Sequence, residues 1–501
     1  RCNMMKRKFA ILGLTAAACL GLALGLAACT DNNADNTGGG ENGGGTTDDP
    51  VPVHVHRVSA DSDGVCDDCH ETLYEGSMGF TLSDNLKYYK ASASGCKGDV
   101  TVPSYYKGRG ETEYLPVLEL TLAGNNVESL HIPAGIEAIG RDSLNVVCMN
   151  ALTEVTIESG NTHYYVEDDA LYKVDDDNLI MAWNIGETYT VPDKVDTIRT
   201  SMFYYCGDLV NLVIPASVKE IQRNAFANCK NLKSVIFEEG SQLDSIGENA
   251  FLRCASIKEI QIPASVSSLG TSLFKDCENL QSVIFEDGST VDALPYYIFD
   301  GCAALETVKI PAPVSSLDVS LFRNCNNLKH VLFEDGSRLK EIQDKMFFEK
   351  PLESIILPKS VENIGRNAFS RSSLKSIKFE EGSRLKRIGE YAFEECTLLT
   401  EVLLPQGLET IADFAFLGCS SLKEVVLPDT LKTLGDRAFS DNALEELILP
   451  ASVQTVGWAI IYNSQDQEPV TTLYVYAPME AVQTWSEEWS LGAKEVIFRN
   501  E

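Results

Sequence analysis

Positive charge is scarce in this sequence of 501 residues. Lys and Arg together number 41 against 73 Asp and Glu, which gives a formal net charge of −32. Binding to the phosphates of DNA or RNA requires clustered Lys and Arg side chains. The charge balance therefore argues against a nucleic-acid partner. It fits a soluble extracellular protein whose net charge opposes self-association.

Motifs of familiar catalytic sites are also missing. The chain contains no Gly-x-Ser-x-Gly, no His-Glu-x-x-His and no phosphate-loop motif. It has six histidines, of which His131, His163 and His330 are scattered. We therefore expect no enzyme. A hydrolase or redox protein would have to rely on the one segment where histidine and cysteine gather.

One repeated unit dominates what is present. The frame Phe-x-x-Cys-x-x-Leu-x-x-Val-x-(Ile or Phe) recurs from about Tyr205 to Leu449. Its cysteines stand at 206, 229, 254, 277, 302 and 325, in steps of 23, 25, 23, 25 and 23 residues, and again at 396 and 419. A period in the twenties with leucine-type positions in register is typical of a leucine-rich repeat solenoid. Each coil would donate one short strand to a parallel sheet, with strands about 4.8 Å apart.

The complete unit adds Pro or an acidic turn after the strand and Ala-Phe before the next cysteine. Over about residues 115–500 it resembles the BspA-like, treponemal-type leucine-rich repeat family. The resemblance implies a β-rich α/β solenoid: a right-handed repeat array with short parallel strands on one face and a cap at each end. Members of the family are exported bacterial surface proteins, several of them implicated in adhesion. Here Pro coils alternate with Glu/Asp-Gly-Ser coils, and this departure prevents any relative's ligand from being carried over.

The N-terminus has the features of an export signal. A basic cluster at residues 6–8 and an apolar run at 9–26 precede Leu26-Ala27-Ala28-Cys29, which resembles a bacterial lipobox. The resemblance implies that residues 1–28 are a lipoprotein signal peptide and that Cys29 is lipidated after cleavage. A plain signal peptide and an uncleaved anchor are the alternatives. We expect attachment to the bacterial cell surface through this lipid.

Composition divides the rest of the chain. Gly, Asn and Asp dominate residues 29–53, which predicts a flexible tether with a reach on the order of 25 Å. A solenoid must also cover both exposed ends of its core. The predicted order after the tether is a Cys/His segment at 54–78, an N-terminal cap at 79–114, a solenoid at 115–456 with a β-hairpin insertion near 159–190, and a C-terminal cap at 457–501.

The Cys/His segment offers four candidate metal ligands: His56, Cys66, Cys69 and His70. Zinc requires about four nitrogen or sulfur ligands in a tetrahedron, which a Cys-x-x-Cys pair and nearby histidines supply. The run Cys66-x-x-Cys69-His70 also matches the attachment pattern of c-type haem. A disulfide, or free thiols in a linker, is the third interpretation. Apart from zinc or haem at this segment, no cofactor is expected.

The cysteines of the repeats, here called the cysteine column, have a simpler interpretation than metal or redox chemistry. In the coil that begins at Phe439, Asn442 takes the cysteine position. Because asparagine replaces cysteine in frame, the position does not require a thiol. We expect each column residue to pack inward in the turn after a short helix of its coil.

Alternation along each strand predicts one outward side chain per coil. These positions hold Val213, Ile236, Gln261, Ile284, Lys309, Leu332, Ile356, Lys378, Leu403, Val426 and Ile448. Eight of the eleven are aliphatic, and an exposed apolar surface of this extent usually marks an interaction site. Strand propensity alone is the alternative explanation. We predict ligand binding at Val213, Ile236, Ile284, Leu332, Ile356, Leu403 and Val426.

A second row along one edge consists of acidic pairs: Glu238/Glu239, Glu286/Asp287, Glu334/Asp335 and Glu380/Glu381. They are either solvated turns or sites for divalent cations, and the turn is the expected interpretation. Together the patterns predict a lipid-anchored adhesin or scaffold that binds a protein or glycan of a host or bacterial surface. A structural spacer of the envelope is the alternative.

Overall fold

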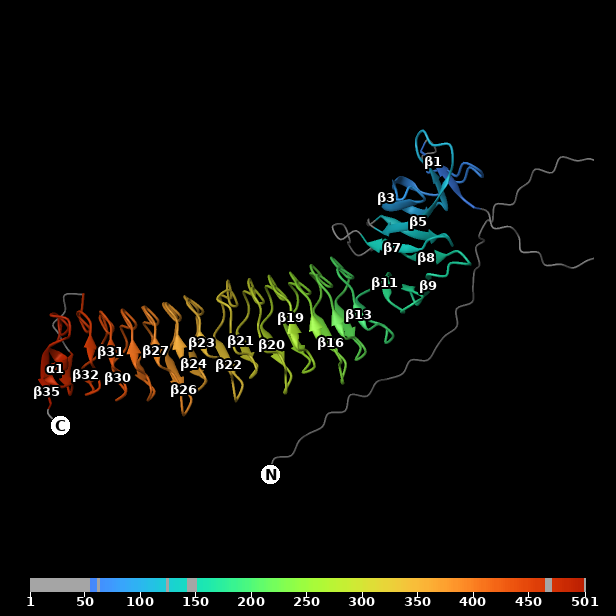
Figure 1. Ribbon diagram of the computed structural model, residues 1–501. Coiled ribbons are helices and arrows are strands. Elements are labelled where there is room, and N and C mark those ends of the chain that lie inside the picture. The colour runs from blue at the N-terminus through green and yellow to red at the C-terminus, as the bar shows by residue number, and fades with distance from the viewer. Residues whose placement is uncertain (1–54, 61–63, 123–125, 142–150, 465–470, 500–501) are drawn as a thin grey trace, which may run out of the picture.

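Stacked short strands form most of the molecule. The computed structural model describes residues 55–60, 64–122, 126–141, 151–464 and 471–499 (Figure 1). A long, nearly straight stack of coils runs from the green to the red part of the chain, and the blue and cyan strands form a separate group at its green end (Figure 1). The signal peptide, Cys29 and the tether predicted at 29–53 lie outside the described residues.

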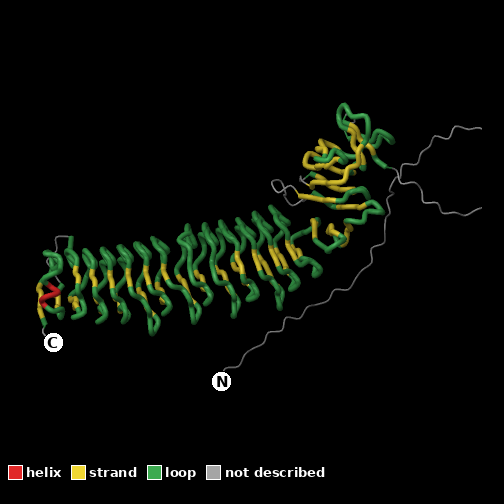
Figure 2. The backbone as a smooth tube through the Cα atoms, in the orientation of Figure 1, coloured by secondary structure: helices red, strands yellow, loops and turns green. Residues whose placement is uncertain are grey.

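Strands of three or four residues line one face of the stack, one from each coil (Figure 2). They are paired in parallel within four sheets, so that Leu212 faces Val235 and Val308 faces Val331 across neighbouring strands. The leucine-rich repeat array with short parallel strands is thereby confirmed. These strands are β12 (Thr188–Thr190), β14 (Asn211–Ile214), β16 (Ser234–Phe237), β18 (Glu259–Ile262), β20 (Ser282–Phe285), β21 (Thr307–Ile310), β22 (His330–Phe333), β24 (Ser354–Leu357), β26 (Ser376–Phe379), β28 (Glu401–Leu403), β30 (Glu424–Val426) and β32 (Glu446–Leu449).

A second set of parallel strands, only two residues long, runs along another side of the coils. In each of these two-residue strands the second residue is aliphatic. Ile221, Ile246 and Ile364, for example, are buried. These strands are β13 (Thr197–Ile198), β15 (Glu220–Ile221), β17 (Ser245–Ile246), β19 (Ser268–Leu269), β23 (Glu341–Ile342), β25 (Asn363–Ile364), β27 (Arg387–Ile388), β29 (Thr410–Ile411), β31 (Thr433–Leu434) and β33 (Thr455–Val456).

The core of the stack is a column of phenylalanine rings. Each ring lies nearly parallel to the next, with centroids 4.8–6.2 Å apart. Every one of them is fully buried. Stacking identical side chains from successive coils fills the interior without gaps, since each coil presents the same surface to its neighbour. The rings belong to Phe203, Phe226, Phe251, Phe274, Phe299, Phe322, Phe347, Phe369, Phe393, Phe416 and Phe439.

The return segments of the described coils are turns rather than the short helices that the sequence suggested. Most coils have two residues with left-handed backbone there, four positions apart, such as Asn224 (φ 55°) and Asn228 (φ 63°). A right-handed helix cannot continue through such residues. The one α-helix of the described residues is α1 (Met479–Val482). No helix among them combines the length and apolarity needed to cross a bilayer.

The N-terminal strands form a different kind of sheet, with eight strands of mixed direction and their own hydrophobic core. Strand β2 pairs antiparallel with β3, while β3 pairs parallel with β5 along its first part and with β6 along its last. Strand β2 also crosses the predicted boundary between residues 78 and 79, so the Cys/His segment and the cap are one structure. The strands are β1 (Arg57–Ser59), β2 (Glu75–Leu82), β3 (Tyr89–Thr101), β4 (Tyr105–Lys107), β5 (Leu115–Leu122), β6 (Val127–Ile132), β7 (Ala138–Arg141) and β8 (Glu154–Ile157).

Three antiparallel strands join the two parts, within the range of the predicted hairpin insertion. They are β9 (Tyr164–Glu167), β10 (Ala170–Lys173) and β11 (Leu179–Ala182). In β10, Leu171 belongs to the N-terminal core, whereas Ala170 and Tyr172 belong to the core of the stack. Alternation thus sends successive side chains into different cores, and the inserted sheet serves as a wall between them.

At the other end, β34 (Thr472–Val475), α1 and β35 (Glu495–Phe498) follow the last coil. They lie within residues 457–501, the range predicted for the C-terminal cap. Trp485 and Trp489 pack edge to face, with ring centroids 4.9 Å apart, and both are buried. The two indoles extend the hydrophobic core beyond the last phenylalanine ring.

Candidate functional site

The outward side chains of the long strands form a row along the stack, called here the strand face. Ile236, Ile284, Leu332, Ile356, Leu403, Val426 and Ile448 are each 41–65% exposed, while Val213 is half-buried. Their neighbours in the same strands, such as Val235 and Ile355, point inward and are buried. Seven of the eight aliphatic positions therefore stand in solvent, in the register set by strand pairing.

Polar residues interrupt the aliphatic row, and two of them are tied to the acidic turn of the next coil. The Gln261 side-chain amide donates to Glu286 Oε1 at 2.8 Å, and Lys309 Nζ lies 2.9 Å from Glu334 Oε1. The hydrogen bond to Glu334 raises the pKa of Lys309. The strand face thus presents exposed apolar side chains separated by polar ones, two of which are held by a glutamate of the next coil.

A hollow of about 500 Å³ opens on the strand face between β26 and β28. Lys378, Glu380, Glu401, Leu403 and Pro405 are among its lining residues. Strands β26 and β28 are not hydrogen-bonded to each other, so the sheet is interrupted at this point. The coil between them is long, because Ser376 and Glu401 stand 25 residues apart whereas Glu401 and Glu424 stand 23 apart. The acidic turn that supplies the extra length forms one wall of the hollow.

The first carboxylate of most acidic pairs has a structural partner. Glu286 Oε2 accepts the amide of Ala264 at 3.0 Å, Glu334 Oε2 accepts that of Ala312 at 3.1 Å, and Glu380 Oε2 accepts that of Lys359 at 3.0 Å. Each amide belongs to the residue that follows the strand-ending proline of the preceding coil. These contacts support the interpretation as turns, since the carboxylates satisfy backbone donors.

The cysteine column repeats one hydrogen bond. The thiol of Cys254 donates to the carbonyl of Phe226 at 3.1 Å, and Cys229, Cys277, Cys302, Cys325, Cys396 and Cys419 do the same toward the preceding coil. Asn442 donates to the Phe416 carbonyl in the same way, at 3.1 Å. The position therefore requires a buried donor rather than a thiol, as its sequence pattern indicated.

Burial also suppresses the reactivity of six of these seven thiols; the exception is Cys396, whose pKa is lowered by hydrogen bonds from Cys419 and Ser372. Burial acts on the six by disfavouring the charged thiolate. It raises the pKa of Cys229, Cys277 and Cys325 to about 12. Since the thiolate is the nucleophile and the metal ligand, thiols that stay protonated at neutral pH are poor at either role. The column therefore belongs to the fold.

Sequence reasoning missed two features of the solenoid. Lys350 and Ser372 also occupy column positions, three residues after Phe347 and Phe369. In these two coils the next leucine stands five positions after the phenylalanine, as Leu352 does after Phe347, whereas it stands six positions after it in the coils with cysteine. The hollow between β26 and β28 was missed as well, since the 25-residue spacing of its coil also occurs in other coils, such as Ser234 to Glu259.

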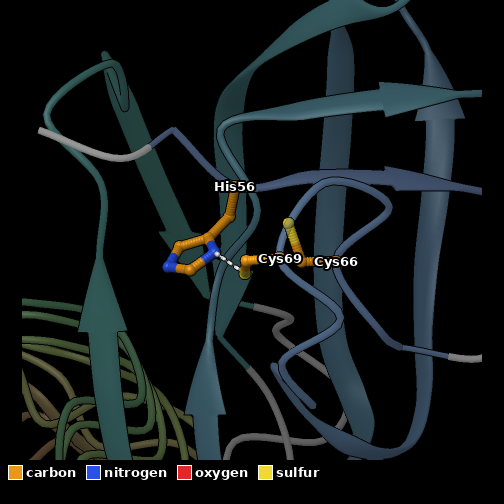
Figure 3. A group of neighbouring side chains, drawn as sticks. All are labelled: His56, Cys66 and Cys69. Carbon is orange, nitrogen blue, oxygen red and sulfur yellow. Dashed lines mark hydrogen bonds between the residues drawn. The ribbon is translucent and has the colours of Figure 1, made fainter. Parts of the chain in front are cut away.

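Three of the four predicted metal ligands come together in the N-terminal sheet, and one does not. The ligand atoms of His56, Cys66 and Cys69 all lie within 4.8 Å of one another (Figure 3). His70 is exposed and lies outside this group. Its backbone is left-handed, with φ 59°, and its N–H donates to the Cys66 carbonyl at 2.9 Å. Its backbone closes the turn, and its ring is not among the three grouped donors.

Comparison with solved structures finds similar bacterial proteins. A leucine-rich repeat protein from Bacteroides ovatus is 23% identical over 84% of this chain and 88% of its own, with a TM-score of 0.47. The pneumococcal vaccine antigen PcpA is 24% identical over 68% of this chain and 99% of its own, with a TM-score of 0.38. A leucine rich cell surface protein from Faecalibacterium prausnitzii is 19% identical over 70% of this chain and 93% of its own, with a TM-score of 0.32.

A comparison with curated proteins finds no match. The family model described as BspA type leucine rich repeat region matches residues 196–329 and 340–468, in six copies. These two ranges cover more than half of the chain and contain the phenylalanine stack, the cysteine column and most of the strand face. The chain belongs to the BspA type leucine-rich repeat family.

Proposed function

We propose that the protein is a binding module of the bacterial cell surface, which holds a protein or glycan partner on its strand face. The observation that carries the proposal is the row of seven exposed aliphatic side chains in strand register. Exposed apolar surface of this extent is rare in a protein that has no partner.

The hollow between β26 and β28 is the proposed centre of the contact. Leu403, the most exposed aliphatic of the row at 65%, lies in its lining beside Lys378 and Glu401. Interfaces concentrate their binding energy in a central apolar pocket surrounded by a polar rim. Here the apolar and charged groups stand in that arrangement. A partner would place an apolar or aromatic group against Leu403 and polar groups toward the lysine and the glutamates.

The location at the cell surface rests on the lipobox of the sequence. Lipidation at Cys29 would hold the protein on a membrane, since multiple acyl chains anchor durably, and the 29–53 segment would tether the solenoid to the lipid. The similar protein from F. prausnitzii is described as a cell surface protein, and we extend that location to this chain.

The test is a binding screen of the purified protein against host matrix proteins, glycans and bacterial surface proteins. A saturable partner is expected. Its binding should weaken at least tenfold in the triple variant Ile284→Asp, Leu332→Asp, Ile356→Asp. The matched control is Leu86→Asp, Val319→Asp, Leu491→Asp, which places the same charges on exposed aliphatic positions outside the strand face.

Equal losses in both triple variants would show that added negative charge, rather than the strand face, weakens binding. A folded protein that binds nothing in the screen would favour a structural spacer of the envelope. This test does not depend on whether a metal ion is bound at His56, Cys66 and Cys69.

A further inference from the structure

The group of His56, Cys66 and Cys69 lies far from the strand face, in the N-terminal sheet, and the proposed function does not use it. The turn that carries both cysteines is closed by backbone hydrogen bonds. Cys66 N–H donates to the Glu71 carbonyl at 2.9 Å, and Val65 and Thr72 form an antiparallel bridge. Together with the left-handed residue after Cys69, these bonds fold the Cys-x-x-Cys sequence into a compact knuckle that brings its thiols close together.

The histidine comes from a different segment, which the backbone fixes independently. The His56 carbonyl accepts the amides of Ser104 at 3.1 Å and Tyr105 at 3.3 Å, at the point where β1 pairs with β4. The knuckle is attached to the same strand, since Asp67 N–H donates to the Arg57 carbonyl at 2.7 Å. Main-chain bonds on both sides therefore hold the three side chains in place before any ligand arrives.

The spacing of the donor atoms fits a tetrahedral metal ion. Zn–S bonds of about 2.3 Å and Zn–N bonds of about 2.0 Å place sulfur and nitrogen about 3.5 Å apart, and two sulfurs about 3.8 Å apart. Cys69 Sγ lies 3.8 Å from His56 Nδ1, and all three donor atoms lie within 4.8 Å (Figure 3). Shortening the longest of these separations by about 1 Å would complete the coordination.

We propose that this group is a structural zinc site, with Cys66 Sγ, Cys69 Sγ and His56 Nδ1 as its protein ligands. Two thiolates and an imidazole form a donor set that zinc favours over calcium or magnesium. The fourth position is filled by water or by a donor other than these three side chains. Cys66 is fully buried, which disfavours covalent attachment of haem at this thiol. The ion would fasten the knuckle to β1 at the end of the chain where the tether enters.

The test uses the full protein, purified with reductant, stripped with a chelator and titrated with Zn²⁺ against a chromophoric competitor. One equivalent is expected to bind with submicromolar affinity. Co²⁺ in its place should give the intense visible and near-ultraviolet bands of tetrahedral thiolate coordination. His56→Ala, Cys66→Ser and Cys69→Ser should each lower the affinity by a hundredfold or more.

Two matched variants guard against a loss of folding. His70→Ala and Cys96→Ser change a neighbouring histidine and a buried cysteine of the same sheet that the site does not use, and both should bind zinc as the wild type does. Loss of binding in His70→Ala would overturn the ligand assignment. Failure of the wild type to bind one equivalent, or a Cys66–Cys69 disulfide that persists under the reductant, would overturn the proposal without any variant.

Discussion

The solenoid and the N-terminal sheet solve the same problem in different ways. Both bury aliphatic and aromatic side chains under short strands. The solenoid, however, repeats one coil, with one phenylalanine ring in each and one buried donor in most. The N-terminal sheet has strands of 3 to 13 residues in mixed directions, and its longest, β3, pairs with three different partners. Among its described residues one aromatic pair is stacked, Phe80 and Tyr106, and this pair packs against the core.

The difference shows where each kind of site can form. Repetition in the solenoid produces a surface that is nearly the same in every coil, which suits an extended contact with a partner. In the N-terminal sheet segments distant in sequence meet once, as His56 meets Cys69, and such a meeting can create a single metal site. The inserted strands β9, β10 and β11 separate the two, since they send side chains into both cores.

The largest expected contrast is the response to alkali, because six buried column thiols with raised pKa values belong to the solenoid: Cys229, Cys254, Cys277, Cys302, Cys325 and Cys419. Unfolded thiols ionise near 9.0, whereas Cys229, Cys277 and Cys325 stay protonated in the fold up to about 12. The unfolded chain therefore loses protons first, and stability falls as pH rises through this window. Each thiol contributes up to about 1.4 kcal/mol per pH unit.

Urea denaturation at pH 7.5, 9 and 10.5 measures this effect. The triple variant Cys254→Ser, Cys277→Ser, Cys302→Ser should start less stable and then lose less stability with pH than the wild type. Parallel pH profiles for the two proteins would mean that the column does not govern the alkaline response.

Removing one ring from the stack is the next largest change. Phe274 lies between Phe251 and Phe299, with centroids 5.8 and 6.2 Å away, and is fully buried. Phe274→Ala should destabilise the solenoid by about 3–5 kcal/mol, because it leaves a cavity that the fixed coils cannot close. Phe80→Ala in the N-terminal sheet, where the ring is only half-buried, should cost less than half as much. Similar decreases in the urea midpoint of both variants would show that the two regions do not differ in their dependence on a single ring.

Close approach of the coils predicts a smaller effect at Gly270. A Cβ at this position would lie 2.2 Å from the backbone nitrogen of Glu248. Gly270→Ala should therefore separate two coils and cost about 1–3 kcal/mol. Gly207→Ala is the control, because a Cβ there meets nothing within 4 Å. A thermal melt in which both variants match the wild type would show that the coils move apart without cost.

The smallest predicted effect is shared by the two regions. Glu158 accepts the Ala134 amide at 2.8 Å in the N-terminal part, just as Glu286 accepts that of Ala264 in the solenoid. Glu158→Ala and Glu286→Ala should each cost about 1–2 kcal/mol, since a backbone donor loses its charged acceptor. Asp287→Ala, at the exposed second position of the pair, should be neutral in the same denaturation experiment. A loss confined to one region would show that the turn has different roles in the two.

The regular part of the fold was predictable because the same residue types recur at a regular spacing along the sequence. Phe226, Cys229 and Val235 recur in frame, and each identity follows from the same contact in every coil. The left-handed turns were not predicted, since the residue types involved, such as Arg253 (φ 57°) and Asn228, also occur in helices. The mixed N-terminal sheet has no period to detect. Its strand order depends on contacts between distant segments that a single sequence does not reveal.

The candidate sites also differ in whether they follow from local sequence or from contacts between distant segments. The exposure of Ile284 and Leu332 followed from strand alternation, which is local. The Cys-x-x-Cys pair indicated a metal group, but only the folded turn separates Cys69, which faces His56, from His70, which closes the turn. The hollow beside Leu403 lies where β26 and β28 are not paired, and alternation within one strand contains no information about its neighbour.

Hydroxyl-radical footprinting with the bound partner tests the central claim most directly, because it reports the solvent exposure of individual side chains. We predict that the partner protects Ile284, Leu332, Ile356 and Leu403 from oxidation and leaves Leu86 and Val319 unchanged. Protection of Leu86 or Val319, with the strand-face residues still oxidised at the rate of the free protein, would contradict the assignment of binding to this face.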